Sequence, residues 1–243
     1  MTNVISYAVR TYSKHLELIT LSSLSFIISF ILPAFAQFPT FNDLGSIFVR
    51  TASIYYNLDI QSTIIIIAAT MFSLLFLSFA IVAMAVVVKH SRTSTRITKE
   101  VLDGLESYTG KVFTILLLFT GVLMIADIAL YGTGYAGIFT AVLGLILTPF
   151  FIFAPSSVVI DESSAIRAIK RSARFFAKRF DYFLLWLAIA IILLTLVDGI
   201  AIGVSGTLVS RYAVLVVDSI FVLPFLTILI NEMYMKRFAL LKI

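Results

Sequence analysis

Residues 62–88 read STIIIIAATMFSLLFLSFAIVAMAVVV, a run of 27 residues without a charged side chain. A helix needs about 20 mostly apolar residues to cross the hydrocarbon core of a bilayer. The strands of a membrane β-barrel are much shorter and alternate polar with apolar residues. This run does not alternate, so it predicts a transmembrane α-helix.

The whole chain has the composition of a membrane protein. Its 243 residues are 60% hydrophobic and only 13% charged, and their mean hydropathy is +1.08. Soluble domains are about 45–50% apolar and about 25% charged. The composition therefore excludes a soluble globular domain, and it excludes a disordered chain, which would lack apolar residues.

Five further stretches have the length and apolar character of a membrane span. We therefore expect an all-α, polytopic integral membrane protein in which residues 1–243 form a single membrane domain. Its six helices are expected to form three hairpins, each entered through a short cytoplasmic segment. The short connection at residues 131–135 forces an antiparallel pair, and the connection around residues 205–206 is also short. The spans lie at about residues 16–36, 62–88, 112–131, 135–154, 182–204 and 212–231.

The charges are sorted between the connections. Of the 18 basic residues, 16 lie before the first span, between the second and third, between the fourth and fifth, or after the sixth. Only Arg50 and Arg211 lie in the other connections. By the positive-inside rule both termini are cytoplasmic, in a multi-pass protein of the cell membrane. The pI near 9.5 is then a sign of orientation.

Residues 163–181 predict a basic amphipathic helix between the fourth and fifth spans. Apolar residues recur there at helical spacing: Ile166, Ile169, Ala173, Phe176 and Phe180. The same segment carries six cations: Arg167, Lys170, Arg171, Arg174, Lys178 and Arg179. One interpretation is an interfacial linker helix with its cations toward anionic lipid. The other is a docking surface for a cytoplasmic partner or for a nucleic-acid backbone.

Residues 155–172, PSSVVIDESSAIRAIKRS, combine a proline, an apolar run, an acidic residue and an amphipathic helix with Ala, basic residues and Ser. This pattern resembles a signature of a broad six-helix membrane family. That family includes the membrane domain attached to some glycerophosphodiester phosphodiesterases and many uncharacterised bacterial and archaeal proteins. The resemblance implies the six-helix fold. The attached phosphodiesterase barrel is absent here, so that activity is not carried over.

Three acidic residues, Asp127, Asp198 and Asp218, fall inside expected spans, in the outer part of the bilayer. Intramembrane acids are costly and often mark ion or proton sites. The three could converge on one polar site for a cation or proton. Alternatively, each reaches the outer interface or bonds locally to a backbone or hydroxyl group.

Prolines interrupt three of the expected spans, at Pro33, Pro149 and Pro224. Each favours a helix kink, and each is interpreted either as a static bend or as a hinge. Gly199 and Gly203 form a small-residue stripe that favours packing against a neighbouring helix or against a second copy in a homo-oligomer.

Catalytic motifs are missing from the sequence. It has no cysteine, its two histidines are far apart, and it has no phosphate-cradling glycine loop. We therefore expect no enzyme, no cofactor and no metal site. Any energy-driven role needs a separate motor ATPase or an ion gradient.

Three functions remain. The first is a non-enzymatic subunit of a multi-component transport machine, with membrane lipids and other membrane subunits as partners. A channel or translocation pore is one form that such a subunit takes. The layout is similar to that of the membrane subunit of the crenarchaeal DNA-import system, which makes DNA import one candidate and nucleic acid one partner. The second is a self-contained proton- or cation-coupled small-molecule transporter that uses the intramembrane aspartates. The third is a structural or lipid-organising protein.

Overall fold

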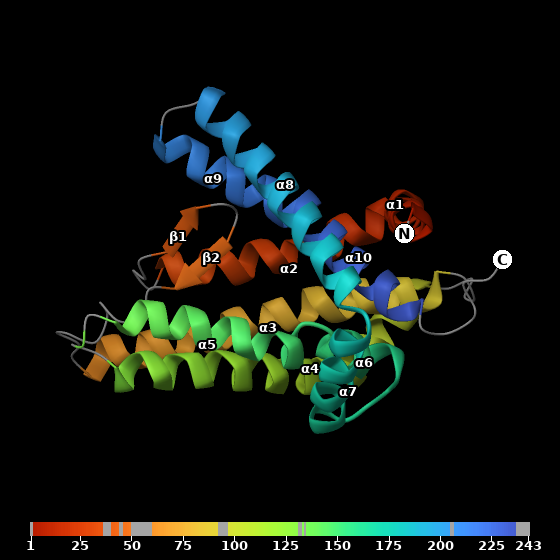
Figure 1. Cartoon of the computed structure of the whole chain (residues 1–243). Helices are drawn as coiled ribbons and strands as arrows, with labels where there is room; N and C mark the ends of the chain where they lie inside the picture. Colours follow the sequence, from red (N-terminus) through yellow and green to blue (C-terminus); the bar gives the residue numbers. More distant parts are fainter. Residues whose placement is uncertain are drawn as a thin grey trace.

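The computed structural model describes residues 2–35, 40–43, 46–49, 60–91, 97–130, 133, 135–204 and 207–236. This part of the chain is almost entirely helical (Figure 1). Its elements are α1 (Thr2–Lys14), α2 (Leu16–Phe35), β1 (Thr40–Asp43), β2 (Ser46–Val49), α3 (Ile60–His90), α4 (Ile97–Ala129), α5 (Ala136–Phe151), α6 (Ala154–Ile160), α7 (Ala165–Lys178), α8 (Phe180–Val204), α9 (Thr207–Val217), the π-helical segment η1 (Asp218–Val222) and α10 (Leu223–Met235).

Five helical segments among the described residues are long and apolar enough to cross a membrane. They are Ile64–His90, Ile97–Ala129, Gly137–Ile160, Phe180–Ala201 and Tyr212–Met235. A sixth is reached only if α1 and α2, which meet at an angle of 92°, are counted as one bent span. The prediction of a polytopic helical membrane protein is confirmed at this level.

α1 is a helix that the sequence analysis did not expect. The buried residues Val4, Ala8 and Thr11 lie on one face of it and pack toward α10. Their spacing of three and four residues is typical of an amphipathic helix. This spacing is the signal of α1 in the sequence, but the segment lacks the long apolar run of a membrane span.

α4 begins at Ile97, well before the expected start of the third span at residue 112. The charged residues near its start lower the hydropathy of this helical extension, so the apolar pattern did not indicate it. The helix continues because Val101 and Gly104 pack against α3. A short antiparallel hairpin of β1 and β2 is a further difference from an all-α chain, with Thr40 paired to Val49.

The core lies where α3 and α10 meet the other elements. One apolar cluster joins α1, α2, α3 and α10 to Phe153, Phe175 and Tyr182. A second joins α3 to α4, α6 and α7. By contrast, large apolar side chains such as Ile125, Leu145 and Ile192 are exposed on α4, α5 and α8. Lipid is the solvent that makes such exposure favourable.

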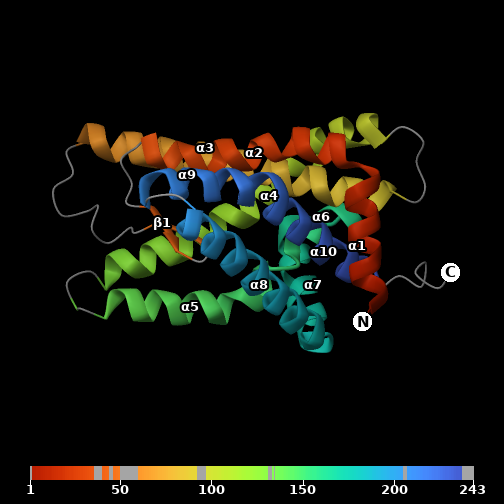
Figure 2. The ribbon, with the colours of Figure 1, turned by 90° about the horizontal axis from the view of Figure 1, so that it is seen from above.

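α1, α6, α7 and the end of α10 gather at one end of the molecule, and β1 lies toward the opposite end (Figures 1 and 2). The end of α3 lies with the first group, since Lys14 Nζ donates to the backbone oxygen of Ser91 at 3.5 Å. The fold thus collects elements that are far apart in the sequence at a single end.

Candidate functional site

The segment that resembles the six-helix family forms a compact corner between α6 and α7. Pro155 occupies the first turn of α6, where its missing N–H costs nothing. Glu162 then takes a positive φ of 52°, which reverses the chain. Ser163 Oγ donates to the backbone oxygen of Ser157 at 2.9 Å and fixes the corner before α7 begins.

Asp161 ties this corner to α7 and α10. Its Oδ2 atom accepts hydrogen bonds from Ser157 Oγ at 3.1 Å and from Tyr234 Oη at 2.7 Å. The same atom forms an ion pair with Arg171 Nη1 at 3.0 Å. The Asp161 side chain is only 4% exposed, so these donors take the place of water. The acidic residue of the motif therefore holds three elements together.

Ser172 bridges the break between α5 and α6. Its Oγ donates to the backbone oxygen of Pro149 at 3.0 Å and accepts from the backbone N–H of Phe153 at 3.1 Å. The two backbone groups are four residues apart, so the serine stands where a helical hydrogen bond would otherwise form. The last residue of the motif thus fixes the direction in which the chain leaves Pro149.

Glu162 is exposed but paired. Lys89 Nζ lies 2.7 Å from its Oε1. This hydrogen bond, together with the charge of Lys89, holds the pKa of Glu162 below its ordinary value. The ion pair joins the α6–α7 corner to the end of α3.

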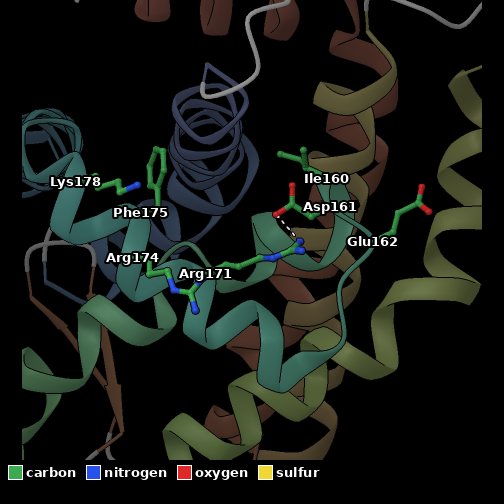
Figure 3. A pocket seen from close by; sticks show the side chains of 7 residues that line it. All are labelled: Ile160, Asp161, Glu162, Arg171, Arg174, Phe175 and Lys178. Carbon is green, nitrogen blue, oxygen red and sulfur yellow. Dashed lines mark ion pairs between the residues drawn. The ribbon is translucent and has the colours of Figure 1, made fainter.

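An open pocket of about 580 Å³ lies at the same corner (Figure 3). We call it the cationic pocket; its lining residues are Ile160, Asp161, Glu162, Arg171, Arg174, Phe175 and Lys178. Asp161 is neutralised by Arg171 and Glu162 by Lys89. Within the described chain, Arg174 and Lys178 form no ion pair, so the pocket holds two positive charges in excess.

The other cations of α7 are arranged differently. Arg167 Nε donates to Ser164 Oγ at 3.0 Å, and Lys170 is exposed. Arg179 binds both carboxylate oxygens of Asp181 at 3.1 Å. Hydrogen bonding to Asp181 raises the pKa of Arg179. The six predicted cations therefore do not form one uniform surface.

The buried face of α7 differs from the predicted one. Ala168, Ser172 and Phe175 are buried, whereas Ile166 is 68% exposed. Phe175 packs edge-on against Phe153, with ring centroids 4.7 Å apart. The spacing of apolar residues alone does not indicate that the polar Ser172 lies on the packed face.

Asp198 and Asp218 come together between α8 and η1, close enough for their charges to interact. Asp218 is 3% exposed, and within the described residues neither of its carboxylate oxygens has a hydrogen-bond partner. Ser219 beside it is also buried, and its hydroxyl has no partner there either. π-Helical segments occur frequently at functional sites.

Asp127 lies elsewhere, on the hairpin formed by α4 and α5. It is 5% exposed, and its Oδ1 accepts a hydrogen bond from Thr140 Oγ1 at 3.3 Å. The structure thus brings two of the three predicted acids together and gives the third a local hydroxyl partner. Among the described residues, no group of three or more His, Cys, Asp or Glu side chains could hold a metal ion.

The three prolines have different settings. Pro33 lies near the end of α2, and Pro149 lies inside α5 near the break between α5 and α6 that Ser172 bridges. Pro224 is the second residue of α10, the helix that begins where η1 ends. Because proline has no N–H, the backbone oxygen of Ile220 loses its helical donor. Tyr12 Oη of α1 donates to that oxygen at 3.4 Å.

Two residues at the basic end escaped the sequence analysis. Asp161 was quoted as part of a motif but was not assigned a role. Glu232 lies just beyond the expected end of the sixth span, yet it is 1% exposed and accepts a hydrogen bond from Thr11 Oγ1 at 2.8 Å. A charged residue after an apolar run usually faces water, so only its contact with α1 could reveal its burial.

No family model, curated protein or solved structure matches the chain. The resemblance of residues 155–172 to the six-helix family therefore stays a prediction.

Proposed function

We propose that this chain is a non-enzymatic, multi-pass subunit of a membrane transport machine, and that its basic end binds a polyanion. The observation that carries the proposal is the cationic pocket, whose volume is about 580 Å³ and in which Arg174 and Lys178 lack an ion pair within the described residues. A polyanion such as DNA binds by replacing its counterions with lysine and arginine side chains. The exposed Lys170 on the same helix extends the positive surface.

The clustering of basic elements supports a cytoplasmic location for this end in the cell membrane. α1, α7 and the end of α10 lie together (Figure 2). By the positive-inside rule such an end faces the cytoplasm, which puts both termini on that side. α7 then lies at the inner interface, where its cations meet anionic lipid, DNA or a separate motor ATPase.

DNA binding by the purified protein in lipid nanodiscs tests the proposal. We expect the affinity to fall with increasing salt. The double variant Arg174→Gln/Lys178→Gln should weaken binding and reduce the slope of the logarithm of affinity against the logarithm of salt by about 2.

Arg167→Gln is the matched control, because it removes a cation from the same helix outside the pocket lining. Equal losses in the control and in the double variant would contradict a role for the pocket. No DNA binding at low salt would refute DNA as the polyanion. A pull-down from native membranes that recovers no motor ATPase or other membrane subunit would refute the machine.

A second function, a proton- or cation-coupled carrier, is favoured by a different observation. Asp218 is buried without a hydrogen-bond partner among the described residues and faces the charge of Asp198. A proton or a monovalent cation bound between the two carboxylates would relieve their repulsion. Release of that ion on the other side of the membrane would couple it to transport.

Uptake into liposomes that contain only this protein tests the carrier. We expect Asp198→Asn and Asp218→Asn each to abolish uptake, whereas Asp127→Asn retains it, because Asp127 lies in a separate hairpin beside Thr140. Full uptake by both of the first two variants would exclude the acidic pair as the coupling site.

A further inference from the structure

The three basic side chains of the cationic pocket lie on one flank of α7. Arg171, Arg174 and Lys178 are spaced by three and four residues, which places them one above the next along the helix. Arg174 and Lys178 are exposed, and the Arg171 side chain is 39% exposed. A ligand that enters the pocket from solvent therefore meets all three of them.

Arg171 is held in a fixed orientation by Asp161. Its Nη1 atom lies 3.0 Å from Asp161 Oδ2, and Figure 3 shows the side chain extending toward that carboxylate. Asp161 is itself fixed, because Tyr234 Oη donates to the same oxygen at 2.7 Å. A guanidinium group has five N–H donors in a planar fork that matches the geometry of a phosphate. Asp161 engages one end of this fork, so the remaining donors are positioned for a second oxyanion.

The charge and the size of the pocket match a terminal phosphate group. Its lining has an excess of two positive charges within the described chain, which come from Arg174 and Lys178. A phosphate monoester carries a charge of about −1.5 to −2 at pH 7 and offers three acceptor oxygens. A phosphodiester inside a nucleic-acid strand carries a single negative charge. The volume of about 580 Å³ is typical of a site for one small ligand, so a strand end fits it better than a continuous backbone.

The opposite flank of α7 adjoins a membrane span. Phe176 packs against Phe180 and Phe183, with ring centroids 5.3 Å and 4.9 Å away. These two residues begin α8, which is long and apolar enough to cross a membrane. Two positions along an α-helix correspond to a rotation of about 200°, so Arg174 and Lys178 point away from Phe176. The pocket thus opens away from the start of this span, which favours a ligand from the aqueous side over a lipid headgroup.

We infer that the cationic pocket binds the terminal phosphate monoester of a DNA strand. Arg171 and Arg174 donate hydrogen bonds to the phosphate oxygens, and Lys178 supplies the remaining positive charge. The inference rests on the proposed function, in which the basic end binds DNA. It adds that the pocket holds the end of the strand in preference to its internal phosphodiesters.

Two single-stranded oligonucleotides of one sequence test this preference. One carries a 5′-phosphate and the other a 5′-hydroxyl, and both carry a fluorophore at the 3′ end. Each is titrated, at one salt concentration, against the full chain in nanodiscs of phosphatidylcholine, which has no net charge. We expect the phosphorylated strand to bind about tenfold more tightly, because charge-assisted hydrogen bonds are stronger than neutral ones.

Substitutions on α7 locate the phosphate. Arg174→Gln and Lys178→Gln should each reduce the ratio of the two affinities, whereas Arg167→Gln, which lies outside the pocket lining, should keep it. An undiminished ratio in both pocket variants would overturn the inference. Loss of the preference in nanodiscs that contain phosphatidic acid would assign the pocket to a lipid phosphate and overturn the DNA end as its ligand.

Adenosine 5′-monophosphate and adenosine provide a second comparison, which needs neither a polyanion nor a variant. We expect calorimetry to detect binding of the monophosphate and not of adenosine. Equal affinity of the two oligonucleotides for the unaltered chain would overturn the inference and leave the proposed DNA binding intact. If neither oligonucleotide binds, DNA is refuted as the ligand; recognition of a phosphate monoester then stands if adenosine 5′-monophosphate binds, and it is refuted if that probe fails as well.

Discussion

Asp218→Asn should make the protein more stable, because it removes a charge from a buried position. Asp218 is 3% exposed, and neither carboxylate oxygen has a hydrogen-bond partner among the described residues. A buried polar group without partners costs about 1–3 kcal/mol, and more when it is charged. The neighbouring charge of Asp198 adds repulsion. Asparagine has nearly the same volume, so the substitution opens no cavity. It still places a polar group there, so the expected gain is the part of the cost that comes from the charge and from its repulsion by Asp198.

We therefore expect the free energy of unfolding to rise by about 2 kcal/mol. For a chain of this length that corresponds to an increase of about 4–8 °C in the thermal midpoint. The midpoint can be followed in lipid nanodiscs through the fluorescence of Trp186, the only tryptophan. Asp127→Asn is the control: Asp127 already accepts a hydrogen bond from Thr140, so no comparable gain is expected.

The double variant Asp198→Asn/Asp218→Asn tests the physical reason. Once one charge is gone the repulsion is gone, so the second substitution should add less than it does alone. A lower thermal midpoint for Asp218→Asn would refute the reasoning, and strictly additive gains would show that the two carboxylates do not interact. A gain in stability together with a loss of uptake would indicate that the charge is retained for function.

Three further substitutions test the packing of the basic end. Gly104→Ala should destabilise the protein by about 1–3 kcal/mol, because a Cβ atom there would lie 2.5 Å from Val86 Cγ2. Adding Val86→Ala to this variant should restore the midpoint of thermal unfolding. An unchanged midpoint in Gly104→Ala alone would contradict the close approach. Asp161→Ala should lower the midpoint by the equivalent of about 3 kcal/mol, since it leaves three donors without their acceptor; Asp161→Asn, which keeps an acceptor, should lose less. Glu162→Gln should cost less than about 1 kcal/mol near neutral pH, because its ion pair with Lys89 is largely exposed. The folded-state pKa of Glu162 lies below its ordinary value of 4.5, so the stabilisation is present above about pH 4.5 and disappears as the pH falls through the folded-state pKa. A difference between the variant and the unaltered chain that did not shrink as the pH fell below 4.5 would argue against the pair.

Hydropathy was sufficient for the helical membrane architecture because each long apolar run must satisfy its own backbone hydrogen bonds in lipid. The run at residues 62–88 lies within α3, which extends from Ile60 to His90. The same reasoning failed at α1 and at the start of α4, where the helices carry charged or polar residues. Those helices are stabilised by packing on α10 and α3, and contacts with distant segments leave little trace in local composition.

The candidate sites were also predictable from the sequence only in part. The sequence by itself determined the solvent, the membrane spans, the sorting of basic residues and the presence of three intramembrane acids, because these depend on composition along the chain. Only the tertiary structure decided that Asp198 meets Asp218 while Asp127 bonds to Thr140. It also decided that Arg171 is neutralised by Asp161, whereas Arg174 forms no ion pair with any residue that the structure describes. The attraction between two charged side chains weakens as the distance between them grows, so an ion pair forms only where the fold places the two side chains next to each other.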